Sequence, residues 1–357
     1  MRYYKNLFNL IIDPENLFLA WEIFKRGKKN KPDVLQFEKN LEANIFALHR
    51  NLADKAYQPS YYRDFWICDP KRRHIHRAAV RDRILHHAIF RILNYVFDPT
   101  FITASFSCRF GQGTHRGVLI VEQMLRQTSR NYTKTTYALK CDIKNFFASV
   151  DHTILLRILE RRIKDNNLKW LIREIVESYP AVTRERERER GGGTLPFSIK
   201  GIPIGNLTSQ LFANVYLNEF DQFIKHELKI KNYVRYSDDF IIILESKDYL
   251  NNLLTPIQSF LCRRLKLELH PKKVEIRKLK QGIDFLGQII LPHHRRLRLR
   301  TKKRMFRKLT QKIKDYHTGF ISKNSFQASI QSYLGMLSHC RSHHLSEKLK
   351  NYCWLNF

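Results

Sequence analysis

Two acidic positions stand out because each lies at the end of a predicted strand in a strongly basic chain. Asp142 ends an extended run over residues 137–142, and Asp238 and Asp239 lie in a turn directly before the apolar run 240–244. Two Mg²⁺ ions about 3.5–4 Å apart, bridged by carboxylates, stabilise both the attacking and the leaving oxygen of a phosphoryl displacement. Mg²⁺ is usually held by a few carboxylates and substrate phosphates. The three aspartates therefore indicate nucleotidyl transfer on a nucleic-acid template, the alternative being ordinary turn residues.

The chain carries a large positive charge. Its 357 residues include 64 Lys and Arg against 33 Asp and Glu, which gives a formal net charge of +31 at pH 7. Lys and Arg neutralise phosphates and release counterions, so this excess favours a polyanionic partner. Because 43% of the residues are hydrophobic, the chain has enough apolar side chains for two or three folded domains, and its composition argues against disorder.

The apolar runs and the cysteines indicate the cellular compartment of the protein. The longest strongly apolar runs, such as residues 240–244, are far too short to cross a bilayer. Asp13-Pro14 interrupts the apolar N-terminal stretch, which argues against a signal peptide. The 6 cysteines include no C-x-x-C pair and no disulfide spacing. We therefore expect a cytoplasmic protein with reduced cysteines and no membrane association.

Hydrophobic periodicity predicts the elements that must position the acids. A buried strand over residues 137–142 ends at the first acid, and a hairpin with strands at 233–234 and 240–244 carries the acidic pair at its tip. Helices are predicted at residues 16–24, 34–52, 81–97, 153–163, 207–228 and 249–265, with Pro256 opening the main part of the last one. Extended segments are predicted at residues 60–75 and 285–291, and the Arg/Glu run 184–190 is typical of a surface helix or hairpin tip.

The composition changes after Pro292. Residues 295–314 hold eleven Lys and Arg and no acid, and the spacing from there on predicts amphipathic helices. We expect a domain boundary near residue 290 and an α+β chain. The basic run is expected to grip a nucleic-acid duplex through its phosphates without reading its sequence, the alternative being a solvated helix face.

Several segments, in chain order, resemble motifs of the reverse transcriptases of group II introns and related retroelements. KCDIKNFFASVDH (140–152) is similar to their first palm motif, and YSDD (236–239) matches their Tyr-x-Asp-Asp box. Further similar segments are the fingers motifs at 71–73, 81–83 and 106–113, the strand after the palm at 285–287 and the thumb helix at 332–335.

This resemblance implies a right-hand polymerase with an antiparallel palm sheet and a helical, basic thumb. It assigns residues 1–136 to an N-terminal extension and part of the fingers, residues 137–290 to the palm with fingers insertions, and residues 291–357 to the thumb. The implied activity is RNA-directed DNA polymerisation, in which a primer 3′-OH attacks the α-phosphate of a dNTP and pyrophosphate leaves.

The resemblance also implies roles for single residues. The catalytic residues would be Asp142, Asp238 and Asp239, which together with Ile143 would bind two Mg²⁺ ions, with Mn²⁺ as a substitute. Phe147 would block a ribose 2′-OH and so favour dNTPs, the alternative being a buried aromatic residue at the end of a strand. The expected nucleotide-binding residues are Lys71, Arg73, Phe147, Ile204, Gly205 and Gln210. The expected nucleic-acid-binding residues are Arg295, Arg296, Arg298, Arg300, Lys302 and Lys303.

The segment GIPIGNLTSQ (201–210) resembles the reverse transcriptases of diversity-generating retroelements. Such an enzyme, encoded by a bacterium or phage, makes adenine-mutagenic cDNA from a template-repeat RNA. The implied partners are template RNA, the RNA/cDNA duplex, dNTPs and a small basic helical oligomer, the accessory variability determinant. The alternatives are a retron-like or defence-associated reverse transcriptase, and a group II-type maturase acting mainly as an RNA-binding protein.

The residue type at position 204 has a physical reading of its own. Most relatives carry Gln where this chain has Ile204; a Gln can hydrogen-bond near the incoming nucleotide, whereas Ile offers only dispersion and shape. Losing one positioning hydrogen bond of about 1 kcal/mol should loosen base selection without abolishing catalysis. The alternative is that Ile204 only packs in the core.

Overall fold

The computed structural model describes residues 3–69, 71–179 and 200–354. The chain forms two compact units, each assembled from segments far apart in the sequence. The first unit contains residues 1–108, 142–229 and 255–271, and the second contains residues 109–141, 230–254 and 272–357. The predicted surface element at 184–190 lies outside the described residues.

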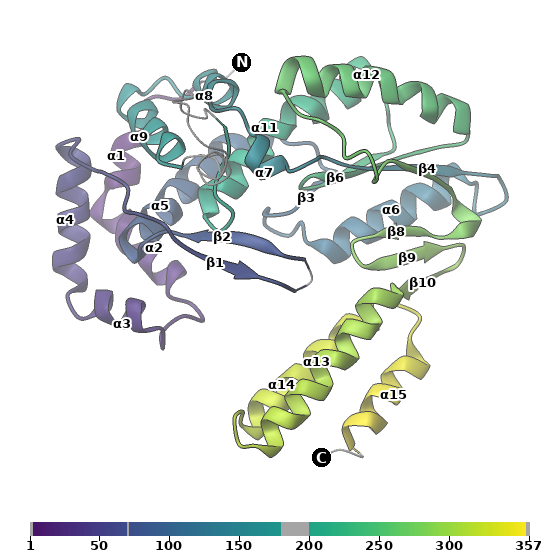
Figure 1. The fold of residues 1–357 in the computed structure, drawn as a ribbon. Coiled ribbons are helices and arrows are strands. Elements are labelled where there is room, and N and C mark those ends of the chain that lie inside the picture. Colours follow the sequence, from purple (N-terminus) through teal and green to yellow (C-terminus); the bar gives the residue numbers. More distant parts are fainter. Residues whose placement is uncertain (1–2, 70, 180–199, 355–357) are drawn as a thin grey trace, which may run out of the picture. The chain divides into compact units, whose positions relative to one another are not determined.

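Helix α5 (Val80–Phe97) is the centre of the first unit, and it matches the predicted helix 81–97 (Figure 1). Ile84, Ala88 and Leu93 are fully buried on it, because apolar residues recur at helical spacing. Helices α2 (Pro14–Phe24) and α11 (Leu207–Gln222) pack against it. The other helices of this unit are α1 (Leu7–Ile12), α3 (Pro32–Glu38), α4 (Leu41–Ala53), η1 (Asp98–Thr100), α7 (Phe146–Ser149), α8 (His152–Glu160), α9 (Asn166–Glu177) and the π-helical turn η2 (Phe223–Glu227).

The extended segment predicted at residues 60–75 is an antiparallel hairpin of β1 (Arg63–Ile67) and β2 (Arg73–Arg77). Its register pairs Trp66 with His74 and Phe65 with Ile75. Neighbouring residues of a strand point to opposite faces, so these two pairs lie on different faces of the hairpin. The short strand β3 (Ser105–Phe106) also belongs to this unit.

The strands predicted to carry the acids belong to one sheet, whose strand residues 137–141 and from Tyr233 onward are in the second unit, while Asp142 is counted with the first unit. The strands of this sheet follow the order β5 (Tyr233–Tyr236), β6 (Asp239–Leu244), β4 (Tyr137–Asp142) and β7 (Glu275–Lys278). β5 and β6 form the predicted antiparallel hairpin, and β4 pairs antiparallel with β7. Helix α6 (Thr114–Thr128) packs on β5 and β6. The central positions of β4 and β6 are buried, which explains their apolar runs.

The strand predicted at residues 285–291 is two strands. β8 (Ile283–Phe285) and β9 (Gln288–Leu291) are separated by a turn at Leu286 and Gly287, both with positive φ. Together with β10 (His294–Leu297) they form an antiparallel meander. Gly287 favours a left-handed conformation that β-strands do not contain, so the chain reverses where the sequence suggested continuity.

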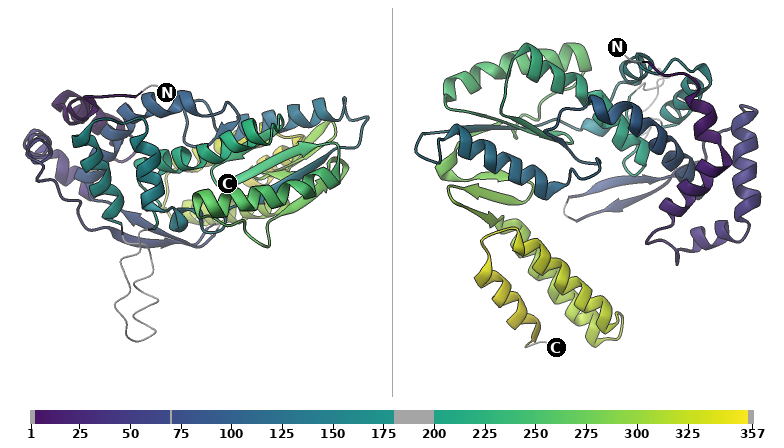
Figure 2. Two further views of the ribbon diagram at one scale, coloured as in Figure 1. Left: turned by 90° about the horizontal axis from the view of Figure 1, so that it is seen from above. Right: turned by 180° about the vertical axis from the view of Figure 1, so that it is seen from behind.

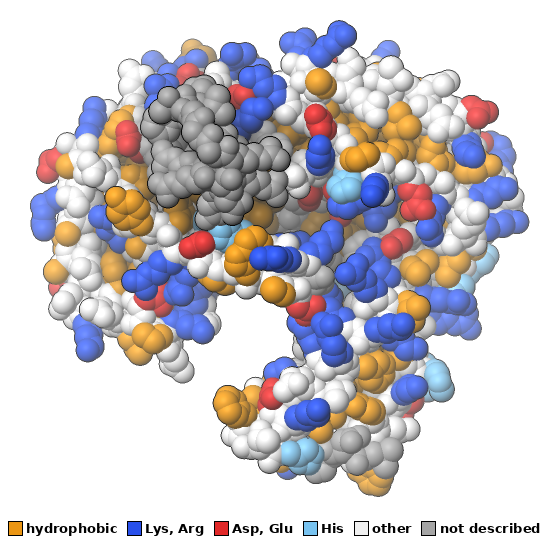
Figure 3. Space-filling model, in the orientation of Figure 1, with side chains coloured by type: hydrophobic (Ala, Val, Ile, Leu, Met, Phe, Trp, Pro, Cys, Tyr) orange, Lys and Arg blue, Asp and Glu red, His pale blue; other side chains and the backbone are white. Residues whose placement is uncertain are grey.

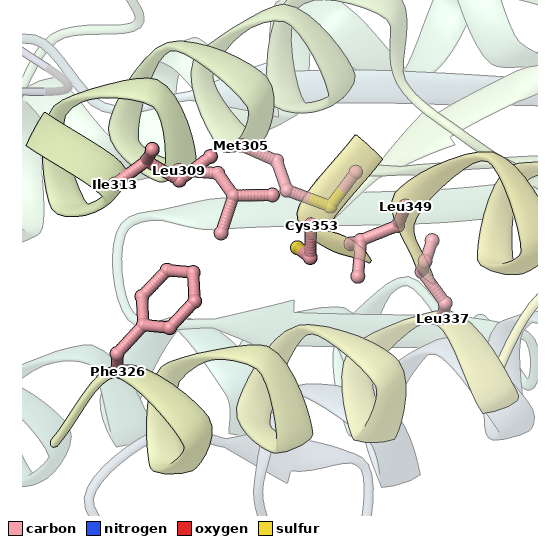
Figure 4. Close-up of a cluster of buried hydrophobic side chains, with 7 residues drawn as sticks. All are labelled: Met305, Leu309, Ile313, Phe326, Leu337, Leu349 and Cys353. Carbon is pink, nitrogen blue, oxygen red and sulfur yellow. The ribbon is translucent and has the colours of Figure 1, made fainter. Parts of the chain in front are cut away.

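The C-terminal helices share a core of their own. α13 (Leu299–His317), α14 (Lys323–Ser338) and α15 (His343–Trp354) form a small bundle, drawn in yellow-green to yellow in Figure 2. Figure 4 shows the seven buried side chains between them: Met305, Leu309, Ile313, Phe326, Leu337, Leu349 and Cys353. This confirms the amphipathic helices predicted after Pro292, although the strand β10 comes first.

Two predicted helices differ from the structure. The helix expected at 34–52 is broken between α3 and α4, where Asn44 Nδ2 donates to the Phe37 carbonyl at 3.0 Å. Pro256 lies inside α12 (Lys247–Leu265) and does not open its main segment. A proline at this position leaves the carbonyl of Asn252 without its helical donor, and this residue is exposed and can bind water.

The fold is a mixture of helices and sheets, as expected. None of the described helices is long and apolar enough to cross a membrane. All six cysteines are free thiols. The assignment of fingers, palm and thumb to residues 1–136, 137–290 and 291–357 stays a prediction.

Phe326 provides a test of the C-terminal bundle. Its ring is fully buried and stacks on Tyr316 with centroids 5.6 Å apart. Phe326→Ala should destabilise the bundle by about 3–5 kcal/mol, because it removes buried apolar surface and leaves a cavity. Hydrogen–deuterium exchange of the full chain should therefore accelerate in α13–α15. Phe320→Ala, at a residue that is 87% exposed, is the matched control; equal exchange in both variants would contradict the assigned core.

Candidate active site

Asp142 is the last residue of β4, and its backbone is fixed by a segment from another part of the chain. Only 7% of its surface is exposed. Its carbonyl accepts a hydrogen bond from the His270 amide at 2.8 Å. Ile143 is buried and forms an isolated antiparallel bridge with Leu269. The strand end that carries the predicted catalytic acid is therefore well ordered.

Asp238 and Asp239 lie at the tight turn between β5 and β6, where Tyr236 pairs with Asp239. Ser237 in this turn has a φ of 54°, in the left-handed region that few non-glycine residues adopt. Arg235 is fully buried, and its Nη1 donates to the Ser237 carbonyl at 3.1 Å. Because a buried guanidinium needs acceptors, Arg235 stabilises this turn. This role of Arg235 was not predicted, since nothing in the sequence pattern marks a buried arginine.

The acidic strand ends belong to neighbouring strands. β6, which begins at Asp239, lies next to β4, which ends at Asp142. Carboxylate oxygens are the ligands that Mg²⁺ prefers, so these residues fit that ion by donor chemistry. Across residues 3–69, 71–179 and 200–354, no group of three or more His, Cys, Asp or Glu side chains forms a metal-holding cluster. Convergence of the three acids on metal ions stays a prediction.

The loop after β4 is tied to the segment that carries Ile204. The Ile202 amide donates to the Phe147 carbonyl at 2.8 Å. The Phe147 ring is half-buried and meets the buried Phe146 ring edge-on, with centroids 5.4 Å apart. The structure thus brings together the segments of two predicted nucleotide-binding residues, Phe147 and Ile204.

Gly205 is held against the β1–β2 hairpin. The His76 amide donates to the Ile204 carbonyl at 3.2 Å. Gly205 has a φ of 132°, and a Cβ at this position would lie 3.1 Å from the His76 carbonyl oxygen and 3.4 Å from Ile75 Cγ2. Only glycine combines this backbone conformation with such a close approach.

The remaining predicted nucleotide-binding residues lie on the hairpin and on α11. Lys71 and Arg73 are exposed, and Arg73 begins β2 on the same face as Ile75. Gln210 is half-buried, and its Oε1 accepts a hydrogen bond from Cys108 Sγ at 3.3 Å. The structure therefore gathers the segment 204–210 at the hairpin, with Lys71 in the turn at its tip.

A cavity of about 390 Å³ adjoins these residues within the first unit. Its walls come from the end of α2, both hairpin strands, α5 and residues 205–207 and 210. Arg83 Nε and Asn206 Oδ1, both at this cavity, are buried without a hydrogen-bond partner among the described residues. Burial lowers the pKa of His86 and of His87 to about 4, so both are neutral at pH 7. This polar wall was not predicted, and its only signal in the sequence is the set of charged and histidine residues within 81–87.

The basic residues predicted to bind nucleic acid divide into two groups. Arg296, Arg300 and Lys303 are exposed and Lys302 is half-buried; in Figure 3 blue side chains gather over the start of α13. Arg295 forms an ion pair with Glu122 at 3.4 Å, and Arg298 forms one with Asp284. The side chains of this second group have acidic partners within their own unit.

Comparison with known proteins decides the family. The profile of the family "Reverse transcriptase (RNA-dependent DNA polymerase)" matches residues 69–290. The chain belongs to the reverse transcriptase family. This confirms the expected enzyme class, an RNA-directed DNA polymerase. The matched range contains both acidic strand ends, the hairpin residues Lys71 and Arg73, and the segment 201–210.

The individual relatives share about a quarter or less of their aligned residues with this chain. The chain is 25% identical to Protein YkfC of Escherichia coli over 84% of each chain. It is 21% identical to the group II intron-encoded protein LtrA of Lactococcus lactis, over 80% of this chain and 56% of LtrA, so it spans little more than half of that relative. Among solved structures, a truncated apo telomerase from Candida tropicalis aligns with a TM-score of 0.46 at 13% identity, over 68% of this chain and 57% of that one. The family assignment depends on the sequence profile alone.

Arg235 gives a testable consequence of the turn geometry. Arg235→Met removes a charge-assisted hydrogen bond of about 1.5–3 kcal/mol. Primer extension should fall about 10–100-fold, and half-saturation should require more Mg²⁺ because the acidic turn is less well ordered. Arg235→Lys should recover part of the activity. The matched control is Arg277→Met on the exposed surface of β7; an unchanged Mg²⁺ dependence in Arg235→Met would refute the positioning role.

Proposed function

We propose that the chain copies RNA into DNA by a metal-dependent reaction at Asp142, Asp238 and Asp239, and that it is of the diversity-generating type. The observation that carries the proposal is the position of these acids at the ends of neighbouring strands within the segment matched by the family profile. Mg²⁺, when bound by these carboxylates, would stabilise the charge on the attacking and leaving oxygens. The protein would supply the orientation of the reacting groups.

The chain's own residues would orient the incoming dNTP. Arg73 and Lys71 are exposed cations on the hairpin, and the planar guanidinium of arginine suits phosphate oxygens. Phe147 has its carbonyl fixed by Ile202, which limits the movement of the backbone that carries its ring. A rigid aromatic ring at this position would exclude a ribose 2′-OH on steric grounds.

Ile204 supports the proposal of low fidelity. Its backbone is fixed by the hydrogen bond from His76, while its half-buried side chain has no polar atom. It can therefore shape the nucleotide site only by contact. Template-repeat RNA and the accessory variability determinant are the partners proposed with this subtype, on the resemblance of the segment GNLTSQ (205–210).

The duplex of template and cDNA would be held by the exposed cations of the C-terminal region. Arg296, Arg300 and Lys303 are available for phosphate contacts. Arg295 and Arg298 are proposed to act with them more weakly, because each already has an acidic partner.

A second candidate function follows from the relatives. LtrA is named a group II intron-encoded protein, and an Arabidopsis thaliana relative, 27% identical over 40% of this chain and 16% of its own, is named a nuclear intron maturase. A chain of this kind would act mainly by binding RNA. Primer extension on RNA templates separates this candidate from the polymerase, because RNA binding alone extends no primer.

Replacement of the acids tests the proposed chemistry. Asp238→Asn and Asp142→Asn should each lower primer extension at least 1,000-fold, about 4 kcal/mol, because each removes a charged metal ligand. Binding of the RNA template should stay within about twofold, since phosphate contacts to Lys and Arg remain. Asp248→Asn, at an exposed aspartate of α12, is the control. Equal loss of extension and RNA binding would argue against the metal role.

Position 204 tests the mutagenic subtype. Ile204→Gln should reduce misincorporation opposite template adenine about five- to tenfold, because the amide restores a positioning hydrogen bond of about 1 kcal/mol. Errors opposite the other three template bases serve as the internal control. Sequencing of cDNA made on an adenine-rich RNA measures both; an unchanged error spectrum would remove Ile204 from the explanation of fidelity.

A further inference from the structure

The β1–β2 hairpin exposes an unusual amount of aromatic surface. All five residues of β1 are exposed, with Phe65 at 45%, Trp66 at 52% and Ile67 at 41%. A two-stranded hairpin is only marginally stable in water by itself. Exposed apolar side chains bordered by polar ones commonly mark an interaction site.

One face of this hairpin carries a stack of planar side chains. The rings of Trp66 and His74 are 4.5 Å apart and nearly parallel, at 8°. The guanidinium of Arg72 lies 4.1 Å from the Trp66 ring centroid. Asp64 Oδ2 lies 2.5 Å from His74 Nε2 and fixes that imidazole. We name Arg72, Trp66 and His74 the hairpin stack.

Further rings anchor the hairpin stack to the first unit. The ring centroids of His74 and His76 are 4.3 Å apart, and those of His76 and Tyr179 are 4.9 Å apart. The Tyr179 hydroxyl is 3.1 Å from His76 Nδ1; burial raises the pKa of this phenol to about 12, so it keeps its proton. The half-exposed Trp66 ring is thus held in place before any ligand arrives, which lowers the entropy cost of binding.

The charge around the hairpin stack favours an anionic ligand. Residues 61–77 contain five Lys and Arg and two Asp. Arg77 already has Asp33 as an acidic partner, and Asp64 is hydrogen-bonded to His74. Aromatic rings and guanidinium planes interleaved with cations bind unpaired nucleotides, because every base offers a face for stacking. Trp66 and His74 are on the face opposite Ile75, which lines the same cavity as Gly205. The hairpin stack includes none of the proposed dNTP residues.

We propose that the hairpin stack binds an unpaired base of single-stranded nucleic acid, with the exposed cations Arg63 and Arg72 attracting its phosphates. This inference rests on the proposed function, since it assigns the single-stranded template to a surface of the same enzyme. The hairpin stack is proposed as a binding surface only, and its residues take no part in the chemical step.

Fluorescence anisotropy with the full chain tests this proposal. The probes are a labelled RNA/DNA duplex with a ten-nucleotide 5′ RNA overhang, the same duplex with blunt ends, and the duplex with an abasic overhang. Trp66→Ala should weaken binding of the overhang duplex about tenfold, as expected for loss of one base stack. Its affinity for the blunt duplex should not change, which also shows that the variant is folded. The wild type should bind the duplex with the abasic overhang about tenfold more weakly than the duplex with the ordinary overhang. Trp66→Ala should not weaken binding of the abasic duplex any further.

Two variants and one competitor complete the test. Trp66→Phe should restore most of the affinity for the overhang, and Trp354→Ala, at a tryptophan that is 81% exposed on α15, should behave like the wild type. The same measurements in an Asp238→Asn background keep the outcome independent of polymerase activity. The proposal would be overturned if Trp66→Ala lost affinity equally for the overhang duplex and the blunt duplex, or lost affinity for neither. Displacement of the overhang by a polyglutamate peptide, with the same sensitivity to Trp66, would assign the surface to an acidic protein instead.

Discussion

The buried guanidinium of Arg235 and the left-handed turn at Ser237 depend on each other. A fully desolvated cation is costly unless acceptors surround it, and the Ser237 carbonyl provides one at 3.1 Å. The residue that provides this carbonyl has a φ of 54°, in the left-handed region. Asp238 and Asp239 thus lie in a turn whose conformation is stabilised by the buried Arg235 side chain. Their short hairpin would otherwise be free to choose among several turn types.

The positive charge of the chain serves two purposes. Some cations hold the fold together: Arg77 and Arg83 both bind Asp33, and Lys266 binds the buried Asp151 at 2.7 Å. Burial alone would raise the pKa of Asp33, but hydrogen bonds from the two arginines lower it, so this contact persists at neutral pH. The excess of cations over acids is therefore left for the exposed surfaces, where phosphates bind.

The strands that carry the acids could be predicted from the sequence because they are short and apolar. β4 ends at Asp142, and β6 begins at Asp239. The hairpin of β5 and β6 and the helix α5 follow directly from such periodicity. The two strands at 283–291 are predicted as one from the sequence, because the residue type of Leu286 does not mark its positive φ and Gly287 lies within the predicted strand. Likewise Pro256 lies within α12, since an exposed carbonyl tolerates the missing donor. The cavity wall formed by Arg83, His86 and Asn206 joins two distant segments, α5 and the residues before α11, and no local sequence pattern predicts that they lie together.

The contact between Gly205 and the hairpin restricts how this enzyme could be altered. A Cβ at position 205 would lie only 3.1 Å from the carbonyl oxygen of His76, a backbone atom, and the φ of 132° would strain any residue other than glycine. Directed evolution of base selection must therefore leave this residue alone and proceed through its neighbours. Ile204 and Asn206 are the neighbours of this constrained glycine, so substitutions there can change the proposed nucleotide site while the path of the backbone is preserved.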